Sequence, residues 1–448
     1  MSRPNLLFIF SDQHRATATG FAGNPDVQTP NLDALAERGV VFSRAVATLP
    51  VCSPARACLM TGRYPLTHGV VVNDVPLESD AVYFAEALRR AGYRTGYIGK
   101  WHLSGGPWRG FIPPERRAGF EFWRACECSH QYHESPYHGN EPGERLWDGY
   151  DVFAQTDCAI EYISEHADGD QPFALFLAYG PPHDPYDTAP AEFRDLYDPD
   201  ALKLRPNAPE SEANGIRPKL AGYYAHITAI DEAIGRVVAA TEEVGLLENT
   251  ILVYTSDHGD MLGSHGRWTK EKPWDESVRV PCVLSWPAGQ ARAGVHVSQP
   301  LGSVDVMPTM LDLCGAEIPP TVEGTNYAPL VRGEPMDCPE GALIECVQPF
   351  GSWGKIYGGR EYRGLRTARY TYVRDREGPW LLYDDEEDPC QLSNLCGSLE
   401  HREVQERWDA LLRQHIAARG DRFLPGESYM ERFGYEFDKT GRVPIREK

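Results

Sequence analysis

The stretch L-L-F-I-F-S-D-Q, at residues 6–13, joins an apolar run directly to a polar cluster. A continuous apolar run suits a strand buried on both faces, because a half-exposed strand would alternate apolar with polar residues. Further strand-length runs occur at residues 95–98, 173–178 and 251–254, and polar side chains follow each of them. Helical patterns separate the runs. The sequence therefore predicts an α/β fold with a mainly parallel sheet covered by helices on both faces.

Helices and loops can be placed around these runs. Thr29 and Pro30 suit the cap and first turn of a helix. The segments 105–150 and 184–220 carry many glycines, prolines or aromatic residues, and we predict long loops there that form lids or substrate walls. Predicted helices lie at residues 31–38, 84–91 and 223–244.

The character of the chain changes near residue 356. R-G-L-R-T-A-R-Y-T-Y-V-R, at residues 363–374, and W-L-L-Y-D, at 380–384, predict short antiparallel strands, and residues 403–418 predict a closing helix. We therefore predict a main domain over residues 1–355. A smaller C-terminal subdomain of antiparallel strands and a helix, residues 356–448, would contribute to the substrate pocket.

The polar side chains after the apolar runs predict one composite site. In open α/β sheets, ligands bind beyond the carboxyl ends of the strands, so clusters in this position converge. Asp12, Asp257 and His258, with Gln13, offer groups suited to a hard divalent cation such as calcium or magnesium. The alternative is that each aspartate only caps the helix after its strand. That alternative is weaker for the two aspartates together than for either alone.

Basic groups near the same strand ends could hold an anion. Lys100 and His102 project to one side of an extended segment, where they could bind an anion and move a proton. His183 is a second candidate acid, and Lys270 is a further candidate clamp. A loop histidine and a lysine are more often surface groups, and Lys272 leaves the choice of lysine open.

The stretch V-C-S-P-A-R-A-C-L-M-T-G-R-Y-P, at residues 51–65, has an order that a core helix does not require. Pro54 suits the first turn of a helix, which places Cys52 at the positive end of the helix dipole. Arg56 follows one turn later on the same face. A nucleophile or anion at position 52 would lie between the helix start and a guanidinium. A buried cysteine capping a core helix is an equal alternative.

Composition limits the partners and the compartment. A formal charge of −21 argues against nucleic acid or an anionic membrane as the main partner. No run approaches the roughly 18 apolar residues of a membrane span, and the start lacks the pattern of a signal peptide. Eleven cysteines, an odd number without regular spacing, do not predict a disulfide framework. We therefore expect a cytoplasmic protein with reduced thiols.

Taken in order, these stretches resemble the type I sulfatases, the formylglycine-dependent members of the alkaline phosphatase superfamily. C-S-P-A-R-A-C-L-M-T-G-R matches the family pattern C-x-P-x-R followed by T-G-R. The likeness spans nearly the whole chain and includes P-N-L-L-F-I-F-S-D-Q, G-K-W-H, P-P-H-D-P-Y, T-S-D-H-G-D and L-Y-D-D-E-E-D-P. The resemblance implies an alkaline-phosphatase-like fold. It also implies hydrolysis of the sulfate ester of a small carbohydrate or an aryl sulfate.

The resemblance also implies how the reaction runs. Cys52 would be converted to formylglycine (3-oxoalanine) by a formylglycine-generating enzyme that reads Pro54 and Arg56. The hydrated aldehyde would attack sulfur and displace the alcohol, and the aldehyde would re-form as sulfate leaves. Position 52 would complete a metal site, with calcium as first choice and magnesium or manganese as alternatives. The other ligands implied are Asp12, Gln13, Asp257 and His258.

The remaining candidates match sulfate-binding groups of the family. Arg56 would stabilise the hydrated aldehyde and the sulfate, while Lys100 and Lys270 would bind the sulfate. His102 would also bind the sulfate and would lie near position 52. His183 matches the acid that protonates the leaving oxygen. The partners implied are a small sulfate ester and the maturation enzyme, and an oligomer stays open.

Departures from the family pattern keep alternatives open. S-D-Q and D-H replace the Asp-Asp and Asp-Asn pairs of the best-known arylsulfatases, as in sulfatases of sugars and choline and in phosphonate hydrolases. The alternatives are a phosphonate monoester or phosphodiester hydrolase, a choline sulfatase, and a non-catalytic sulfate-binding protein. Lys100 and His102 favour sulfate. Residues that could wall the pocket, or only anchor loops, are Trp108, Trp123, Trp147, Tyr186, Trp353 and Arg360.

Overall fold

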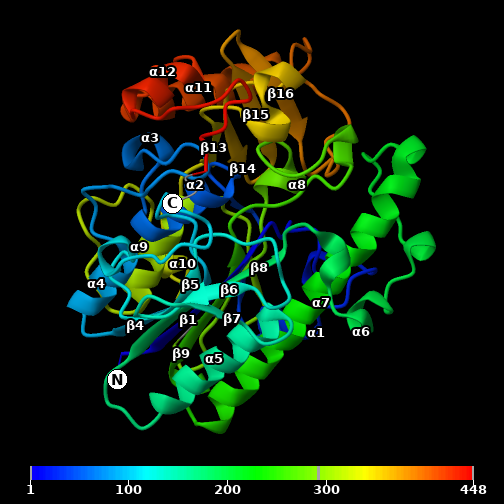
Figure 1. Cartoon of the computed structure of the whole chain (residues 1–448). Coiled ribbons are helices and arrows are strands. Elements are labelled where there is room, and N and C mark those ends of the chain that lie inside the picture. Colours follow the sequence, from blue (N-terminus) through cyan, green and yellow to red (C-terminus); the bar gives the residue numbers. More distant parts are fainter. Residues whose placement is uncertain (1–2, 290–292, 446–448) are drawn as a thin grey trace.

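The computed structural model describes residues 3–289 and 293–445. Within these ranges, one large mixed sheet runs through the molecule, and its central strands are parallel (Figure 1). From one edge to the other, its strands are β11 (Val295–Val297), β2 (Val40–Phe42), β10 (Cys282–Ser285), β9 (Thr250–Ser256), β1 (Asn5–Asp12), β8 (Phe173–Pro182), β4 (Arg94–Lys100), β5 (Phe122–Cys126), β6 (Pro136–His138) and β7 (Glu144–Leu146).

Strand β1 explains why the first apolar run has no polar alternation. Its even-numbered side chains Leu6, Phe8 and Phe10 belong to one hydrophobic core, and Leu7 and Ile9 belong to another on the opposite face. Successive side chains of a strand point to opposite faces, so both faces of this strand are buried. The predicted α/β architecture with a covered sheet is confirmed.

Helices form a layer on each face of the sheet (Figure 1). One layer is built from α1 (Pro30–Arg38), α5 (Asp151–Glu165) and α7 (Ala213–Glu243), which packs along α5. The opposite layer contains α2 (Cys52–Thr61), α4 (Phe84–Arg90), α9 (Ser303–Leu313) and α10 (Ala328–Val331). Shorter helices are α3 (Pro65–His68), α6 (Ala191–Arg194) and α8 (Asp275–Val278), and β3 (Ala45–Val46) pairs with β12 (Leu301–Gly302).

The C-terminal part forms a second, antiparallel sheet. Its strands, in order, are β13 (Gly341–Cys346), β14 (Tyr362–Thr367), β15 (Tyr370–Asp375) and β16 (Pro379–Asp384). One face packs on the long helix α11 (Arg402–Ala418) through Trp408 and Leu412. The other face packs against Met261 and Trp274 of the main part. The chain then forms α12 (Gly426–Arg432), and the predicted boundary at residue 356 falls between β13 and β14.

Two predicted loops contain more regular structure than expected. Residues 105–150 include β5, β6 and β7, which extend the large sheet at one edge. Residues 184–220 include α6 and the first two turns of α7, which begins at Ala213 rather than near residue 223. Glycine and proline gave these segments a loop-like composition, although tertiary pairing with β4 orders the first of them.

Two expectations from composition can be compared with the structure. All eleven cysteines are free thiols, so no disulfide framework is present. Within the described ranges, none of the helices combines the length and the apolar character needed to cross a bilayer.

Candidate active site

The carboxyl ends of adjacent strands bring the predicted polar residues together. The strands β9, β1, β8 and β4 lie side by side in parallel, so they all end at one edge of the sheet. Asp12 and Lys100 are the last residues of β1 and β4, and His183 and Asp257 follow β8 and β9 directly. Residues far apart in the sequence therefore face one site.

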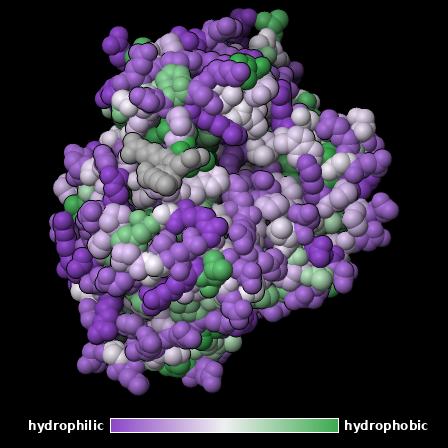
Figure 2. All heavy atoms as spheres, viewed as in Figure 1, coloured by the Kyte–Doolittle hydropathy of each residue, from purple (hydrophilic) through white to green (hydrophobic). Residues whose placement is uncertain are grey.

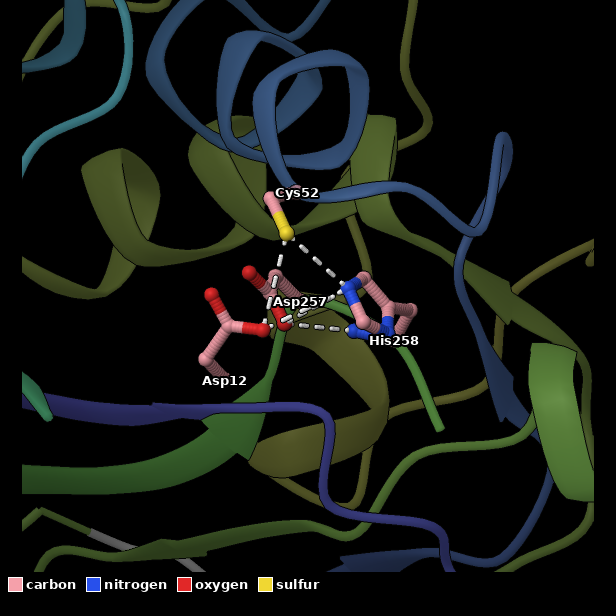
Figure 3. A group of neighbouring side chains, drawn as sticks. All are labelled: Asp12, Cys52, Asp257 and His258. Carbon is pink, nitrogen blue, oxygen red and sulfur yellow. Dashed lines mark hydrogen bonds and ion pairs between the residues drawn. The ribbon is translucent and has the colours of Figure 1, made fainter. Parts of the chain in front are cut away.

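Helix α2 presents Cys52 to this edge of the sheet. Cys52 is the first residue of the helix, Pro54 lies in its first turn, and Gly62 ends it in a left-handed conformation with φ of 63°. The Cys52 Sγ lies 2.9 Å from the Lys270 Nζ and 3.3 Å from the His258 Nε2. It lies 3.6 Å from an Asp12 oxygen (Figure 3). The sulfur thus lies at the start of a helix and among charged groups.

The thiol of Cys52 is strongly polarised by its neighbours. Burial and the charge of Asp12 both oppose ionisation of the thiol. Lys100, Lys270 and His258 outweigh them and lower its pKa well below the usual value. The buried Cys58, two turns along α2, has a pKa raised well above the usual value, chiefly by burial. One helix therefore carries an activated cysteine and an inert one.

A set of buried ligand atoms could hold a divalent cation. Ligand atoms of Asp12, Cys52, Asp257 and His258 all lie within 4.8 Å of one another (Figure 3). The side-chain amide of Gln13 donates to Asp260 at 2.7 Å, while its buried Oε1 accepts no hydrogen bond within the described part of the chain. A buried oxygen without a partner is costly unless something binds it. Carboxylate, amide and imidazole donors fit a hard or borderline divalent metal.

Arg56 holds the two carboxylates of this set in place. Its Nε donates to Asp257 at 3.0 Å, and an Nη donates to Asp12 at 3.2 Å. Its other Nη donates to the backbone oxygen of Lys100 at 2.6 Å. Both the arginine and the two aspartates are almost fully buried. Arg56 therefore contacts the carboxylates of the candidate metal ligands Asp12 and Asp257 and does not line the cavity.

Lys100 and Lys270 both place their ammonium groups near the Cys52 sulfur, at 3.9 and 2.9 Å. The Lys100 Nζ lies 2.6 Å from an Asp12 oxygen and 3.9 Å from the Cys52 Sγ. The preceding Gly99 has a φ of 106°, and a Cβ there would lie 2.1 Å from the backbone oxygen of Ala178. Only glycine permits this close approach of β4 to β8 before the lysine.

His183 is coupled to Lys270. Its Nε2 lies 2.9 Å from the Lys270 Nζ, and its Nδ1 lies 2.8 Å from the backbone oxygen of Asp184. Burial and the charge of Lys270 lower the pKa of His183 well below its usual value. The resting histidine is therefore neutral and accepts a hydrogen bond from the lysine.

His102 lines the same cavity and pairs with Asp74. Its Nε2 lies 3.1 Å from Asp74, which also accepts a hydrogen bond from the Trp108 indole at 2.7 Å. Burial would lower the pKa of His102, but the Cys128 thiol and the Asp74 hydrogen bond raise it to about 10. Because His102 has a φ of 59°, the extended geometry expected for residues 100–102 is wrong, although both side chains line the site.

One cavity of about 500 Å³ is lined by part of the predicted set, namely Gln13, Cys52, Lys100, His102, His183 and Lys270. Asp12, Arg56, Asp257 and His258 lie behind this lining. Asp74 was not predicted as a site residue, although it lies two residues after the apolar run at residues 70–72, as Asp12 lies two residues after the apolar run at residues 6–10. Residues 438 and 442–445 form part of the cavity wall and belong to the C-terminal subdomain predicted to contribute to the pocket, although Trp353 and Arg360, the residues predicted to form that wall, do not line it. Lining residues outside the predicted set include Asp74, Cys128, His130, Phe350, Asp438 and Arg442.

The aromatic candidates divide into one pocket residue and several anchors. Trp108 lines the cavity. Trp123 is fully buried against Tyr97, and Trp147 stacks on Tyr137 with ring centroids 4.0 Å apart, so neither lines it. Bulky aromatic residues at sheet edges gain more from burial than from exposure. Tyr186, Trp353 and Arg360 also lie outside the cavity lining, each hydrogen-bonded elsewhere.

Comparison with known proteins identifies the family. A family model named Sulfatase matches residues 4–316, and a model named N-sulphoglucosamine sulphohydrolase, C-terminal, matches residues 263–418. The chain belongs to the sulfatase family, and its relatives named as sulfatases support a sulfuric ester hydrolase.

Relatives and solved structures agree with this assignment. An ulvan-active sulfatase of Formosa agariphila is 41% identical, covering 98% of this chain and 86% of its own. A Bacteroides fragilis crystal structure, described as a candidate sulfatase, gives a TM-score of 0.85 at 31% identity, covering 96% and 98% of the two chains. A phosphonate monoester hydrolase of Agrobacterium radiobacter gives a TM-score of 0.76 at 26% identity, covering 93% and 96%. The fold is that of the alkaline phosphatase superfamily.

Proposed function

We propose that this sulfatase hydrolyses a sulfate ester of a carbohydrate through a formylglycine made from Cys52. The observation that carries the proposal is the placement of Cys52 at the start of α2, with Lys270, His258 and Asp12 around its sulfur. A core cysteine needs none of these neighbours. Cys58 in the same helix is such a core cysteine, and burial raises the pKa of its thiol.

The chemistry begins at the side chain of residue 52. The maturation enzyme, using an external oxidant, oxidises the Cys52 side chain to an aldehyde and removes its sulfur. Addition of water to the aldehyde gives two hydroxyl groups on one carbon. One hydroxyl oxygen attacks the sulfur and the S–O bond to the alcohol breaks, so the sulfate becomes attached to residue 52. The second hydroxyl then loses its proton, the aldehyde re-forms, and sulfate leaves. The maturation step requires a formylglycine-generating enzyme that reads C-S-P-A-R.

Cations around position 52 suit a sulfate that gains negative charge during the reaction. Lys100 and Lys270 flank the Cys52 sulfur, and the cationic His102 lines the same cavity. Fixed positive groups aimed at developing charge lower the barrier without reorganisation during the reaction. A divalent cation held by Asp12, Asp257, His258 and Gln13 would lower the pKa of the nucleophilic hydroxyl when bound. Calcium is our first choice for that cation.

His183 is placed to protonate the leaving alcohol. It is neutral in the resting site because of burial and the adjacent Lys270 charge. A bound sulfate ester would add negative charge beside the histidine and lysine, which raises the pKa of both groups. His183 would then take up a proton at Nε2, where Lys270 now donates, and pass it to the leaving oxygen.

The alcohol part of the substrate is proposed to be a sugar. The relative with 41% identity is described as active on ulvan, which makes ulvan the first substrate to test. An aryl sulfate remains an alternative, as does choline sulfate. A phosphonate monoester or phosphodiester is the alternative suggested by the Agrobacterium structure. Cytoplasmic location stays a prediction.

Mass spectrometry of the tryptic peptide spanning residues 45–56 tests the proposal, together with release of sulfate from ulvan and 4-nitrophenyl sulfate. We expect exchange of sulfur for oxygen at Cys52 and capture by an aldehyde-reactive probe. In the adjacent tryptic peptide, residues 57–63, Cys58 should stay a thiol. Cys52→Ala should lower sulfate release by about 10⁴-fold or more, since nucleophile loss removes the covalent step. Cys58→Ala is the matched control within the same helix. A thiol at position 52 in protein from its native host, with sulfate still bound, would support the binding-protein alternative.

A further inference from the structure

One wall of the reaction cavity is formed by the end of the chain. Asp438, Arg442 and residues 443–445 line the cavity that also contains Cys52 and Lys270. In Figure 1 the red C-terminal trace returns from the second sheet toward α2, which carries Cys52. The part of a substrate beyond its sulfate therefore faces a surface made by this tail.

Hydrogen bonds hold the backbone turn at residues 438–442, from which the Arg442 side chain projects. The Asp438 carboxylate accepts hydrogen bonds from the backbone N–H of Thr440 at 2.7 Å and of Arg442 at 3.1 Å. The backbone N–H of Asp438 donates to the oxygen of Arg442 at 2.8 Å, and that of Gly351 donates to Thr440 at 3.1 Å. A cation on such an anchored turn loses little backbone entropy when it binds a ligand.

The inner cations of the cavity already have partners. Lys100 pairs with Asp12 at 2.6 Å, Lys270 contacts the Cys52 sulfur and His183 at 2.9 Å each, and His102 pairs with Asp74 at 3.1 Å. These groups surround the place proposed for the sulfate that is cleaved.

Arg442 differs from these inner cations. Its side chain is exposed and, among the residues that the structure describes, makes no hydrogen bond or ion pair. Its charge acts on Asp438 and Glu271 at longer range, but neither carboxylate lies within ion-pair distance. A free guanidinium on an otherwise acidic protein, with a formal charge of −21, presents a local site for an anion.

We propose that Arg442 binds a second anionic group, a carboxylate or another sulfate, on the alcohol part of the substrate. This inference rests on the proposed function, because the cleaved sulfate must occupy the inner cations. A planar guanidinium can bind either group through two parallel hydrogen bonds. The substrate class is then an acidic sulfated oligosaccharide, and a neutral monosulfate uses only the inner part of the site.

The test compares charged and neutral substrates on matched variants. The probes are sulfated oligosaccharides that contain uronate, the same oligosaccharides after reduction of their carboxyl groups to alcohols, and a disulfated oligosaccharide without carboxylate. For the unsubstituted enzyme we expect kcat/KM on one charged probe to exceed that on its neutral counterpart by about tenfold, the size of one charge-assisted contact. The charged probe that shows the preference identifies the group.

In Arg442→Ala, the ratio of kcat/KM for the charged probe to kcat/KM for its neutral counterpart should fall to about one. Turnover of 4-nitrophenyl sulfate, which has no second anionic group, should stay unchanged. Arg442→Lys should keep part of the preference, because it keeps the charge but loses the paired hydrogen bonds. Lys439→Ala, which removes a tail cation outside the cavity lining, should keep all of it. A preference of equal size in Arg442→Ala would overturn the inference. Absence of sulfate release from every oligosaccharide probe and from 4-nitrophenyl sulfate, in enzyme shown to carry the aldehyde, would instead contradict the proposed function.

Discussion

Two clusters of buried charge use the same residue types and differ in how far their charges are satisfied. The first, here the junction cluster, joins α8 of the main part to the C-terminal sheet through Asp275, Arg366 and Asp385. The Arg366 Nε and Nη1 lie 2.9 Å from Asp275 and 3.0 Å from Asp385. Arg279 binds the second oxygen of Asp275, and Gln391 and Thr371 bind the two oxygens of Asp385.

The second cluster, here the site cluster, consists of Asp12, Arg56, Asp257 and the groups around Cys52. It leaves acceptors open, including the buried Oε1 of Gln13. Burial and the charge of Asp12 raise the pKa of Asp257, although His258 and Arg56 oppose them. The pKa of Asp12 is nevertheless held well below its usual value, against burial, by Lys100 and the other cations.

The junction cluster shows the same pair of shifts. Against burial, Arg366 and Arg279 lower the pKa of Asp275, and burial raises that of Asp385 to about 6. The clusters therefore differ in their open acceptors and not in their pKa shifts. Closed charge networks hold parts of a protein together, whereas an incomplete one is prepared for a ligand.

Breaking the junction cluster should give the largest loss of stability. Arg366→Ala leaves two buried carboxylates without their main partner, and we expect a loss of about 3–5 kcal/mol in the free energy of unfolding. The kcat per folded molecule should stay unchanged, since Arg366 does not line the cavity. Denaturant titration measures the first quantity and active-site titration the second.

The control for Arg366→Ala is Arg413→Ala, because Arg413 pairs with Asp409 while 62% exposed. We expect that variant to change the free energy of unfolding by less than about 1 kcal/mol. Equal effects for the two variants would show that the junction cluster is not a special contact.

His183→Asn breaks the site cluster without removing a charge from the resting enzyme, since His183 is neutral there. We expect a loss of at least about a hundredfold in kcat for a carbohydrate sulfate, because an alkoxide needs a proton to leave. The loss should be far smaller for 4-nitrophenyl sulfate, whose leaving group is stable as an anion. Steady-state kinetics on both substrates measure this difference. Equal losses on both would contradict an acid role and indicate that His183 only positions Lys270.

The sequence could predict the features that depend on local patterns, but not those that depend on contacts between distant segments. Strands β1 and β9 were predictable because each is a continuous apolar run that ends in polar residues, and a parallel sheet brings such ends together. Strand β5 was not, since F-W-R-A-C mixes an arginine into a short run whose order comes from pairing with β4. The wall made by Arg442 depends on the packing of its turn against Gly351, about ninety residues earlier, and no local sequence pattern predicts such a contact.

The smallest expected effect separates the two clusters most directly, because only the site cluster should respond to a metal. Calcium at about a hundred times its dissociation constant would stabilise the folded protein by about 2.7 kcal/mol, or roughly 3 °C in Tm for a chain of this size. Asp257→Asn removes one ligand charge and should abolish most of this shift. Arg366→Ala should lower Tm throughout but keep the full calcium shift, because its cluster has no free acceptor. Differential scanning fluorimetry with and without chelator measures all three proteins. A calcium shift that survives in Asp257→Asn would place the metal elsewhere.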